Sequence, residues 1–247
     1  MTKEQKLKKI ENLYNAYKEG KLGGEFMPED ENPNLEKSSK ENFNYFTLPM
    51  ALNYQRNSYK LWESAKKTYI DPETNFIFNT KDVINSSFED VQRALIKYRL
   101  ALQKDKQTQI WIKLCNTIET ILNGDIRNLF KINNFDVNKI RKYMQIDHKK
   151  DFPYLSGNKL CNYWMYVIYQ YTNINYINRE ALTIAPDIHV LRSSVKFEII
   201  TQKEFESSNA QILCINNWNE ILKGTKFAPI DIHTPLWLWG RSGFKEI

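Results

Sequence analysis

The amino-acid sequence predicts an all-α fold, and three features of its composition indicate this class. The chain has 247 residues, of which only 8 are glycine and 8 are proline. So few turn-forming residues argue against a many-stranded sheet protein, which needs a turn signal every few residues. A hydrophobic fraction of 42% excludes a disordered chain, and this length is sufficient to bury a core. We therefore expect long helices joined by short connections.

In the first half of the chain, apolar residues recur at helical spacing in five segments. They predict helices over residues 3–18, 46–52, 58–69, 87–102 and 110–122. Gly20 ends the first helix, and a polar loop follows it to about residue 40. Pro49 is placed in a first helical turn, where its missing N–H costs little. Ser87 and Asp90 form a predicted capping box, whereas residues 76–78 are expected to be extended.

The second half of the chain shows the same periodicity. It predicts helices over residues 125–130, 136–144, 157–171, 188–200 and 229–239. Thr201 and Glu204 predict a capping box that opens a further helix. The helix over residues 157–171 is aromatic on nearly all sides, which is typical of a buried element.

Cysteine usage and charge limit the classes of function. Cys115, Cys161 and Cys214 lie far apart, so they form neither a four-thiolate metal site nor a disulfide framework. We expect no signal peptide and no membrane-spanning helix, because no apolar run is long enough. A reducing cytoplasm is the expected location. The formal net charge of +6 is compatible with a nucleic-acid partner, although many other soluble proteins carry as much.

The segment Phe-Pro-Tyr-Leu-Ser-Gly-Asn-Lys-Leu at residues 152–160 combines a tight turn with a helix start. Free amides at a helix N-terminus can hold a phosphate. The helix dipole and desolvation by Tyr163 and Trp164 would disfavour the charged form of Lys159 and release a nucleophilic amine. The alternative is a lysine whose stem covers apolar surface while its ammonium group stays in water.

Two further segments carry candidate functional residues. In Ile-Ala-Pro-Asp-Ile-His-Val at residues 184–190, Asp187 stands at a helix start, where it is either an N-cap or a carboxylate that stabilises a developing cation. The segment at residues 231–241 places Trp237 and Trp239 two residues apart on a helix, so they cannot share a face. One of them is free to stack on a planar ligand, although core packing accounts for either.

In this order, the three segments resemble those of the helix-hairpin-helix superfamily of DNA glycosylases, and most of all the archaeal 8-oxoguanine (GO) DNA glycosylases. The resemblance covers residues 45–243 and implies a two-lobed all-α fold with the active-site cleft between the lobes. The hairpin then lies at about residues 146–171. On this basis residues 1–40 form an N-terminal helix and polar loop, and residues 41–247 form a single bilobed domain.

The resemblance assigns roles to individual residues. Lys159 corresponds to the Schiff-base lysine and Asp187 to the catalytic aspartate. Tyr163 and Trp237 correspond to the aromatics that stack on the damaged base. His233 stands where the GO enzymes use an acidic residue to read the base. The other expected contacts are Pro186, Gln55 and Trp62 in the base pocket, and Ser156, Gly157 and Asn158 at the DNA backbone.

The implied function is that of a bifunctional DNA glycosylase/AP lyase, which excises an oxidised purine from damaged DNA. The flipped base is displaced by attack of Lys159, and Asp187 assists. We expect no cofactor and no catalytic metal; the resemblance suggests only a structural monovalent cation at the hairpin. The protein is expected to be a monomer, cytoplasmic and nucleoid-associated when bound to DNA.

Three alternatives remain open on the sequence. The nearest is a same-fold glycosylase for another base lesion or a modified nucleoside, which the histidine at position 233 favours. The second is a non-catalytic helical nucleic-acid-binding protein, which would not depend on Lys159. The third is a helical protein–protein adaptor, which would show no salt-dependent binding to DNA.

Overall fold

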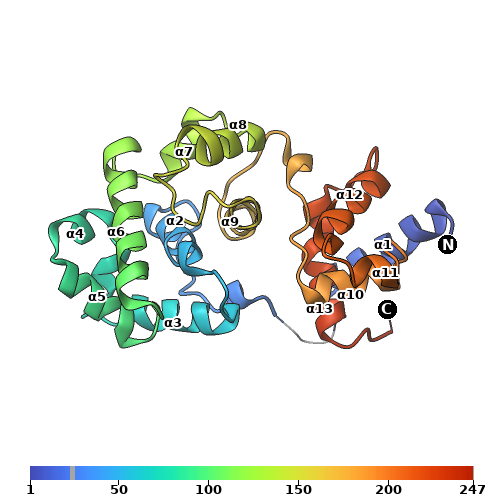
Figure 1. Cartoon of the computed structure of the whole chain (residues 1–247), viewed down its shortest axis with the longest axis horizontal. Helices are drawn as coiled ribbons and strands as arrows, with labels where there is room; N and C mark the ends of the chain where they lie inside the picture. The colour runs from blue at the N-terminus through green and yellow to red at the C-terminus, as the bar shows by residue number, and fades with distance from the viewer. Residues whose placement is uncertain (23–25, 247) are drawn as a thin grey trace. The chain divides into compact units, whose positions relative to one another are not determined.

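The computed structural model describes residues 1–22 and 26–246, so Gly23 and Gly24 of the predicted polar loop lie outside the described residues. The described residues form thirteen α-helices, and their only β pairing is an isolated parallel bridge between Asp136 and Ile177 (Figure 1). The predicted all-α class is therefore confirmed. None of the helices that the structure describes is long and apolar enough to cross a membrane.

The chain folds into two compact units. The middle unit comprises Pro28–Asn178, and the terminal unit combines Met1–Met27 with Arg179–Ile247. The N-terminal helix therefore belongs to the same unit as the C-terminal helices. The chain passes from one unit to the other twice, between residues 27 and 28 within the predicted polar loop and between residues 178 and 179.

The middle unit contains α-helices, three short 3₁₀-helices and one π-helical turn. In chain order these are η1 (Pro28–Asp30), α2 (Lys40–Thr47), η2 (Pro49–Leu52), α3 (Ser58–Ile70), η3 (Asn75–Phe78), α4 (Thr80–Asn85), α5 (Phe88–Lys97), α6 (Lys104–Ile121), α7 (Arg127–Ile132), α8 (Val137–Lys142), the π-helical η4 (Tyr143–Asp147) and α9 (Asn158–Tyr171).

Aromatic side chains fill the core of the middle unit. Trp62, Trp111 and Trp164 are fully buried. Trp111 donates its Nε1–H to the Ile77 carbonyl at 2.9 Å, and Trp164 donates to Thr47 Oγ1 at 3.1 Å. A buried indole N–H without an acceptor would be destabilising. These two hydrogen bonds therefore fix α6 against η3 and α9 against α2.

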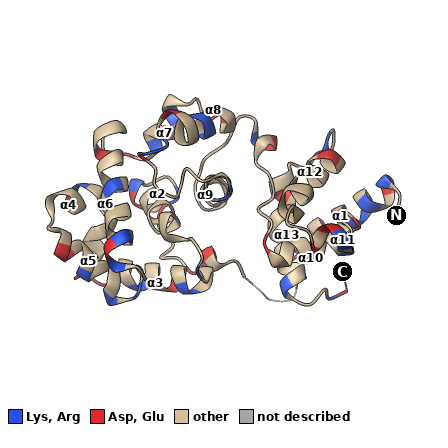
Figure 2. Cartoon of the chain, viewed as in Figure 1, with Lys and Arg blue, Asp and Glu red and all other residues tan. Residues whose placement is uncertain are grey.

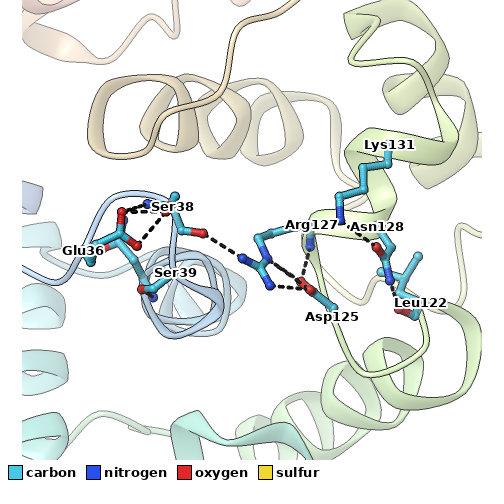
Figure 3. Close-up of polar contacts among 9 residues, drawn as sticks. Glu36, Ser38, Ser39, Leu122, Asp125, Arg127, Asn128 and Lys131 are labelled. Carbon is cyan, nitrogen blue, oxygen red and sulfur yellow. Dashed lines mark hydrogen bonds and ion pairs between the residues drawn. The ribbon is translucent and has the colours of Figure 1, made fainter.

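Arg127 ties the start of α2 to the loop between α6 and α7 (Figure 3). Its guanidinium donates to both carboxylate oxygens of Asp125 at 2.7–3.0 Å and to the Ser38 carbonyl at 2.8 Å. Ser39, the next residue, caps α2 by accepting from the Asn42 amide at 3.1 Å. Asn42 in turn donates to the Tyr171 carbonyl at 2.9 Å, at the end of α9. This chain of contacts positions α9, which carries Lys159.

The terminal unit consists of α1 (Lys3–Lys18), η5 (Arg179–Ala181), α10 (Ile188–Lys196), α11 (Gln202–Phe205), α12 (Ala210–Leu222), η6 (Pro229–Ile232) and α13 (His233–Arg241). Helices α10 and α13 approach very closely at Gly240. A Cβ there would lie 2.6 Å from the His189 carbonyl oxygen and 2.7 Å from Ser193 Oγ. Only glycine therefore fits this crossing without a shift of the two helices.

Lysines of α1 bind the C-terminal end of α10. Lys6 Nζ donates to the Glu198 carbonyl at 2.5 Å, and Lys9 Nζ donates to the Lys196 carbonyl at 3.4 Å. A cation is stabilising at this end of a helix, because the last carbonyl groups carry partial negative charge. The amphipathic N-terminal helix is thereby attached to the terminal unit.

Two predicted helices end early because of residues that are not glycine. The predicted 87–102 helix ends at Lys97, because Arg99 adopts a left-handed conformation (φ 60°) and the Ala101 amide bonds to the Leu95 carbonyl. The predicted 188–200 helix likewise ends at Lys196, with Glu198 at φ 53°. Glycine is the usual residue at such an end.

Other predicted elements differ in type. The 46–52 pattern is split, because α2 ends at Thr47 and Pro49 begins a 3₁₀-helix. Residues 76–78, expected to be extended, belong to the 3₁₀-helix η3, closed by a bond from the Asn79 amide to the Phe76 carbonyl. Helices α4 and α12 were not predicted. The predicted capping box of Thr201 and Glu204 is confirmed.

We predict that Arg127→Ala lowers the free energy of unfolding by about 1–3 kcal/mol, because Asp125 and the Ser38 carbonyl lose their donor in a half-buried environment. Urea denaturation followed by circular dichroism measures this loss. Arg93→Ala is the matched control: the Arg93 side chain is 74% exposed and pairs with Asp90, whose side chain is 47% exposed, so stability should change little. Equal losses in the two variants would contradict the anchoring role of Arg127.

Candidate functional site

A turn at residues 152–157 leads into α9. Tyr154 adopts a left-handed conformation (φ 62°). The Ser156 amide donates to the Phe152 carbonyl and the Gly157 amide to the Tyr154 carbonyl, both at 2.9 Å. A Cβ at Gly157 would lie 3.2 Å from the Tyr154 oxygen, which explains the glycine. Because both amides are engaged within the turn, a phosphate contact at Ser156 would use its hydroxyl group.

Lys159 is the second residue of α9, directly after Asn158, and its side chain is exposed. Trp164 is fully buried and stacks on Phe130 in the core, with ring centroids 5.5 Å apart. The predicted desolvation of the Lys159 amine by Trp164 is therefore wrong. Tyr163 lies four residues after Lys159, so the two residues share one face of α9.

The loop after η2 meets the 152–157 turn through an aromatic pair. Tyr54 stacks on Tyr154, with ring centroids 5.4 Å apart and planes at 29°. Lys106 Nζ lies 5.5 Å from the centroid of the Tyr154 ring, and a hydrogen bond to Tyr154 raises the pKa of Lys106. Tyr54 is 55% exposed. We call Tyr54, Tyr154 and Lys106 the tyrosine cluster; it is an accessible aromatic surface beside a positive charge.

Left-handed residues other than glycine occur in all three loops around the tyrosine cluster. They are Gln55 (φ 51°), Arg99 (φ 60°) and Tyr154. Arg56 joins two of these loops, because its guanidinium donates to the Leu100 carbonyl at 2.7 Å and to the Arg99 carbonyl at 3.3 Å. Burial and then the charge of Arg99 lower the pKa of Arg56 to about 10.

The carboxyl group of Glu29 brings two predicted base-contacting residues together. Its Oε1 accepts a hydrogen bond from Trp62 Nε1 at 3.0 Å and another from the Tyr163 hydroxyl at 3.0 Å. Glu29 and Trp62 are almost completely buried, with exposed fractions of 1% and 0%. The structure thus joins η1, α3 and α9 at one carboxyl group, which the sequence patterns do not indicate.

Burial dominates the titration of Glu29. Desolvation raises its pKa from 4.5 to about 7, against the lowering effect of the hydrogen bonds from its backbone amide, Tyr163 and Trp62. The neighbouring Asp30 carboxylate raises it further and accepts from the Tyr171 hydroxyl at 2.7 Å. Oε2 is buried without a hydrogen-bond partner among the described residues. Glu29 is therefore a carboxyl group that can be neutral or ionised near neutral pH.

In the terminal unit, the N-cap role predicted for Asp187 is confirmed. Its Oδ1 accepts from the amides of His189 at 2.9 Å and Val190 at 3.0 Å, so Asp187 is the N-cap of α10. Its Oδ2 accepts from Trp237 Nε1 at 2.8 Å. The predicted catalytic carboxylate and the predicted stacking aromatic are therefore joined. The close crossing at Gly240 holds α13, and with it Trp237, against α10.

The surroundings of Trp237 are charged and aromatic. The Arg241 guanidinium lies 5.4 Å from the centroid of its ring, and the His189 ring meets it edge-on at 5.8 Å. Pro186 and His233 are buried in the same unit. His233 Nδ1 accepts from the Ala185 amide at 3.4 Å. This contact favours the tautomer with hydrogen on Nε2, which is a donor.

All three cysteines are buried and unbridged. Burial raises the pKa of the Cys161 thiol to about 12 and that of Cys214 to about 11, so neither is an activated nucleophile. No group of three or more His, Cys, Asp or Glu side chains in the described ranges is arranged to hold a metal ion.

The predicted site residues fall into two groups. Gln55, Trp62, Ser156, Gly157, Asn158, Lys159 and Tyr163 belong to the middle unit, and Pro186, Asp187, His233 and Trp237 belong to the terminal unit. Glu29 and the tyrosine cluster were not predicted. No protein-family model matches the sequence, and a search of curated proteins finds no match.

We predict that Glu29 makes stability fall as pH rises. Below pH 4.5 both states hold the proton, whereas between pH 4.5 and about 7 only the folded state does. Stability is therefore lost through this range, by up to about 3 kcal/mol. Glu29→Gln does not titrate, so its free energy of unfolding relative to the wild type should rise between pH 4.5 and 8. Urea denaturation at several pH values measures this difference, and a constant difference would contradict the shift.

Proposed function

We propose that the protein is a bifunctional DNA glycosylase/AP lyase that excises an oxidised purine such as 8-oxoguanine. The observation that carries the proposal is the pairing of Asp187 with Trp237, because the resemblance assigns these residues to catalysis and to base stacking from motifs 50 residues apart. The hydrogen bonds that Trp62 and Tyr163 both donate to Glu29 Oε1 also support the proposal, because these two residues were likewise predicted from separate motifs. In the terminal unit two residues predicted from separate motifs are in contact, and in the middle unit two such residues share one hydrogen-bond acceptor.

The proposed reaction begins when the Lys159 amine gives up a proton to solvent and attacks the anomeric carbon of the damaged nucleotide. The bond between this carbon and the base breaks, and its electron pair leaves with the base. The carboxylate of Asp187 stabilises the positive charge that develops on the sugar. Loss of a proton from nitrogen and opening of the sugar ring give an imine. A proton then leaves the neighbouring carbon, the 3′ phosphate departs by β-elimination, and water releases Lys159.

The base must leave the duplex before this chemistry, because its glycosidic carbon is inaccessible in the stack. Tyr163 and Trp237 are the proposed stacking partners. Each has its polar edge held by a carboxylate, Glu29 for Tyr163 and Asp187 for Trp237. Fixed rings lose little conformational entropy when a base stacks on them, and such stacking contributes about 1–3 kcal/mol per base.

A same-fold glycosylase for another lesion is the nearest alternative, and His233 favours it. The GO enzymes have an acidic residue at this position, which accepts hydrogen bonds from the base. Histidine stands at this position instead, and its Nδ1 accepts from the Ala185 amide.

The second alternative, a non-catalytic nucleic-acid-binding protein, is favoured by the tyrosine cluster, which is independent of Lys159. Lysine and arginine occur on helices of both units (Figure 2), in accord with the net charge of +6. A positively charged surface with an exposed aromatic ring is suited to bind the backbone and a base of a nucleic acid.

Borohydride trapping tests the proposed chemistry. With a duplex that contains 8-oxoguanine, the wild type should form a covalent protein–DNA adduct, and Lys159→Gln should form none, because a glutamine amide cannot make an imine. Lys150→Gln is the matched control: it removes the same charge from an exposed lysine just before the turn and should retain the adduct. An adduct that persists in Lys159→Gln, or none with the wild type on any lesion, would contradict the proposal.

Tyr54 is predicted to contribute to DNA binding through its exposed ring. Tyr54→Ala should weaken binding to a short duplex by about 5- to 100-fold, which corresponds to the loss of one stacked base. Tyr54→Phe keeps the ring and should bind like the wild type. Fluorescence anisotropy at fixed salt concentration measures both affinities. If both variants bind equally well, the tyrosine cluster lies outside the DNA interface.

A further inference from the structure

The two carboxyl oxygens of Glu29 differ in their hydrogen bonding. Oε1 accepts two hydrogen bonds, whereas Oε2 is buried and has none among the described residues. A buried polar atom without a partner typically costs about 1–3 kcal/mol. Oε2 is one of seven such atoms among the described residues, and the only one that belongs to a carboxyl group. Oε2 is therefore a candidate contact for a ligand.

Neighbouring groups do not satisfy Oε2. Asp30, on the same element, accepts from the Tyr171 hydroxyl at 2.7 Å. Lys66 of α3 pairs with Glu31 at 2.8 Å. The Tyr163 hydroxyl of α9 donates to Oε1 rather than to Oε2. The nearby positive charge and hydroxyl groups thus already have other acceptors.

We infer that Glu29 reads the edge of a nucleobase, with Oε2 accepting a hydrogen bond from a ring N–H. This inference rests on the proposed function, because it takes the ligand to be a base. The polar edges of two predicted base-contacting residues, Trp62 and Tyr163, are directed at the same carboxyl group. A base in the oxo form, which carries a ring N–H beside a carbonyl, fits a carboxylate acceptor. A base with a bare ring nitrogen at that position does not.

The contacts of Oε1 determine what an amide would do at this position. An indole N–H can only donate, so Trp62 requires an acceptor at the Oε1 position. In Glu29→Gln the amide oxygen therefore faces Trp62, and the NH₂ group takes the place of Oε2. The substitution exchanges an acceptor for a donor at one defined point. Protonation of Glu29 has the same effect, because the proton resides on Oε2.

Hypoxanthine and adenine are suitable probes, since hypoxanthine carries hydrogen on N1 beside a carbonyl group, whereas adenine has a lone pair on N1 beside an amino group. Calorimetric titration at pH 8 should show the wild type binding hypoxanthine about tenfold or more tightly than adenine. Glu29→Gln should reverse the preference. Between pH 8 and pH 6 the preference of the wild type should diminish, while that of Glu29→Gln stays constant. Glu31→Gln, the same change at an exposed neighbour, should behave like the wild type.

Equal binding of the two bases by the wild type, or no binding of either, would overturn the inference. An unchanged preference in Glu29→Gln would also overturn it. If Glu29→Gln fails to fold, the wild type is tested alone, and a preference for hypoxanthine that does not change between pH 8 and pH 6 would overturn the inference. Borohydride trapping on an abasic duplex, which has no base to read, is scored separately. If the abasic duplex gives an adduct but the two bases bind equally, the lyase proposal stands and only the role of Glu29 is rejected. If the two bases are discriminated but no adduct forms, the role of Glu29 stands and the lyase proposal is rejected.

Discussion

The need to pair buried indole N–H groups is the constraint on which much of this structure depends. Each of the six tryptophans donates to an acceptor in its own unit: Trp62 to Glu29, Trp111 to the Ile77 carbonyl, Trp164 to Thr47, Trp218 to Ser194, Trp237 to Asp187 and Trp239 to the Lys245 carbonyl. Four of these acceptors are uncharged carbonyl or hydroxyl oxygens. The two that use carboxylates are Trp62 and Trp237, and both are candidate base contacts. The same constraint therefore fixes the core and orients the candidate site.

The two carboxylates occupy different environments. Asp187 is half-buried, and its oxygens accept three hydrogen bonds, two of them from amides at the positive end of α10. Glu29 is fully buried, and both of its side-chain bonds fall on one oxygen, so desolvation raises its pKa to about 7. Such a contrast suits Asp187 to stabilise a cation and Glu29 to discriminate between ligands by its protonation state.

Periodicity was sufficient to predict the fold class and most helices, because an amphipathic pattern is a local property of the sequence. Helix ends were predicted less well where a left-handed residue other than glycine stops the helix, as at Arg99 and Glu198. Glu29 could not be predicted, since its partners lie 33 and 134 residues away and no local pattern connects them. Asp187 was predicted from its position at a helix start, but its bond to Trp237 depends on the crossing of α10 and α13.

The structural and functional interpretations of a residue need not exclude each other when they involve different atoms. At Asp187, Oδ1 caps the helix while Oδ2 holds Trp237, and both oxygens act as acceptors. An asparagine there cannot satisfy both, because its NH₂ group must face either the amides of the helix start or the indole N–H. Loss of activity in such a variant would combine a packing defect with a chemical one. At Glu29 only one oxygen is engaged, so an amide has one favourable orientation and the packing is kept. Substitution of Glu29 by glutamine can therefore change ligand binding without disturbing the packing, whereas substitution of Asp187 by asparagine changes both.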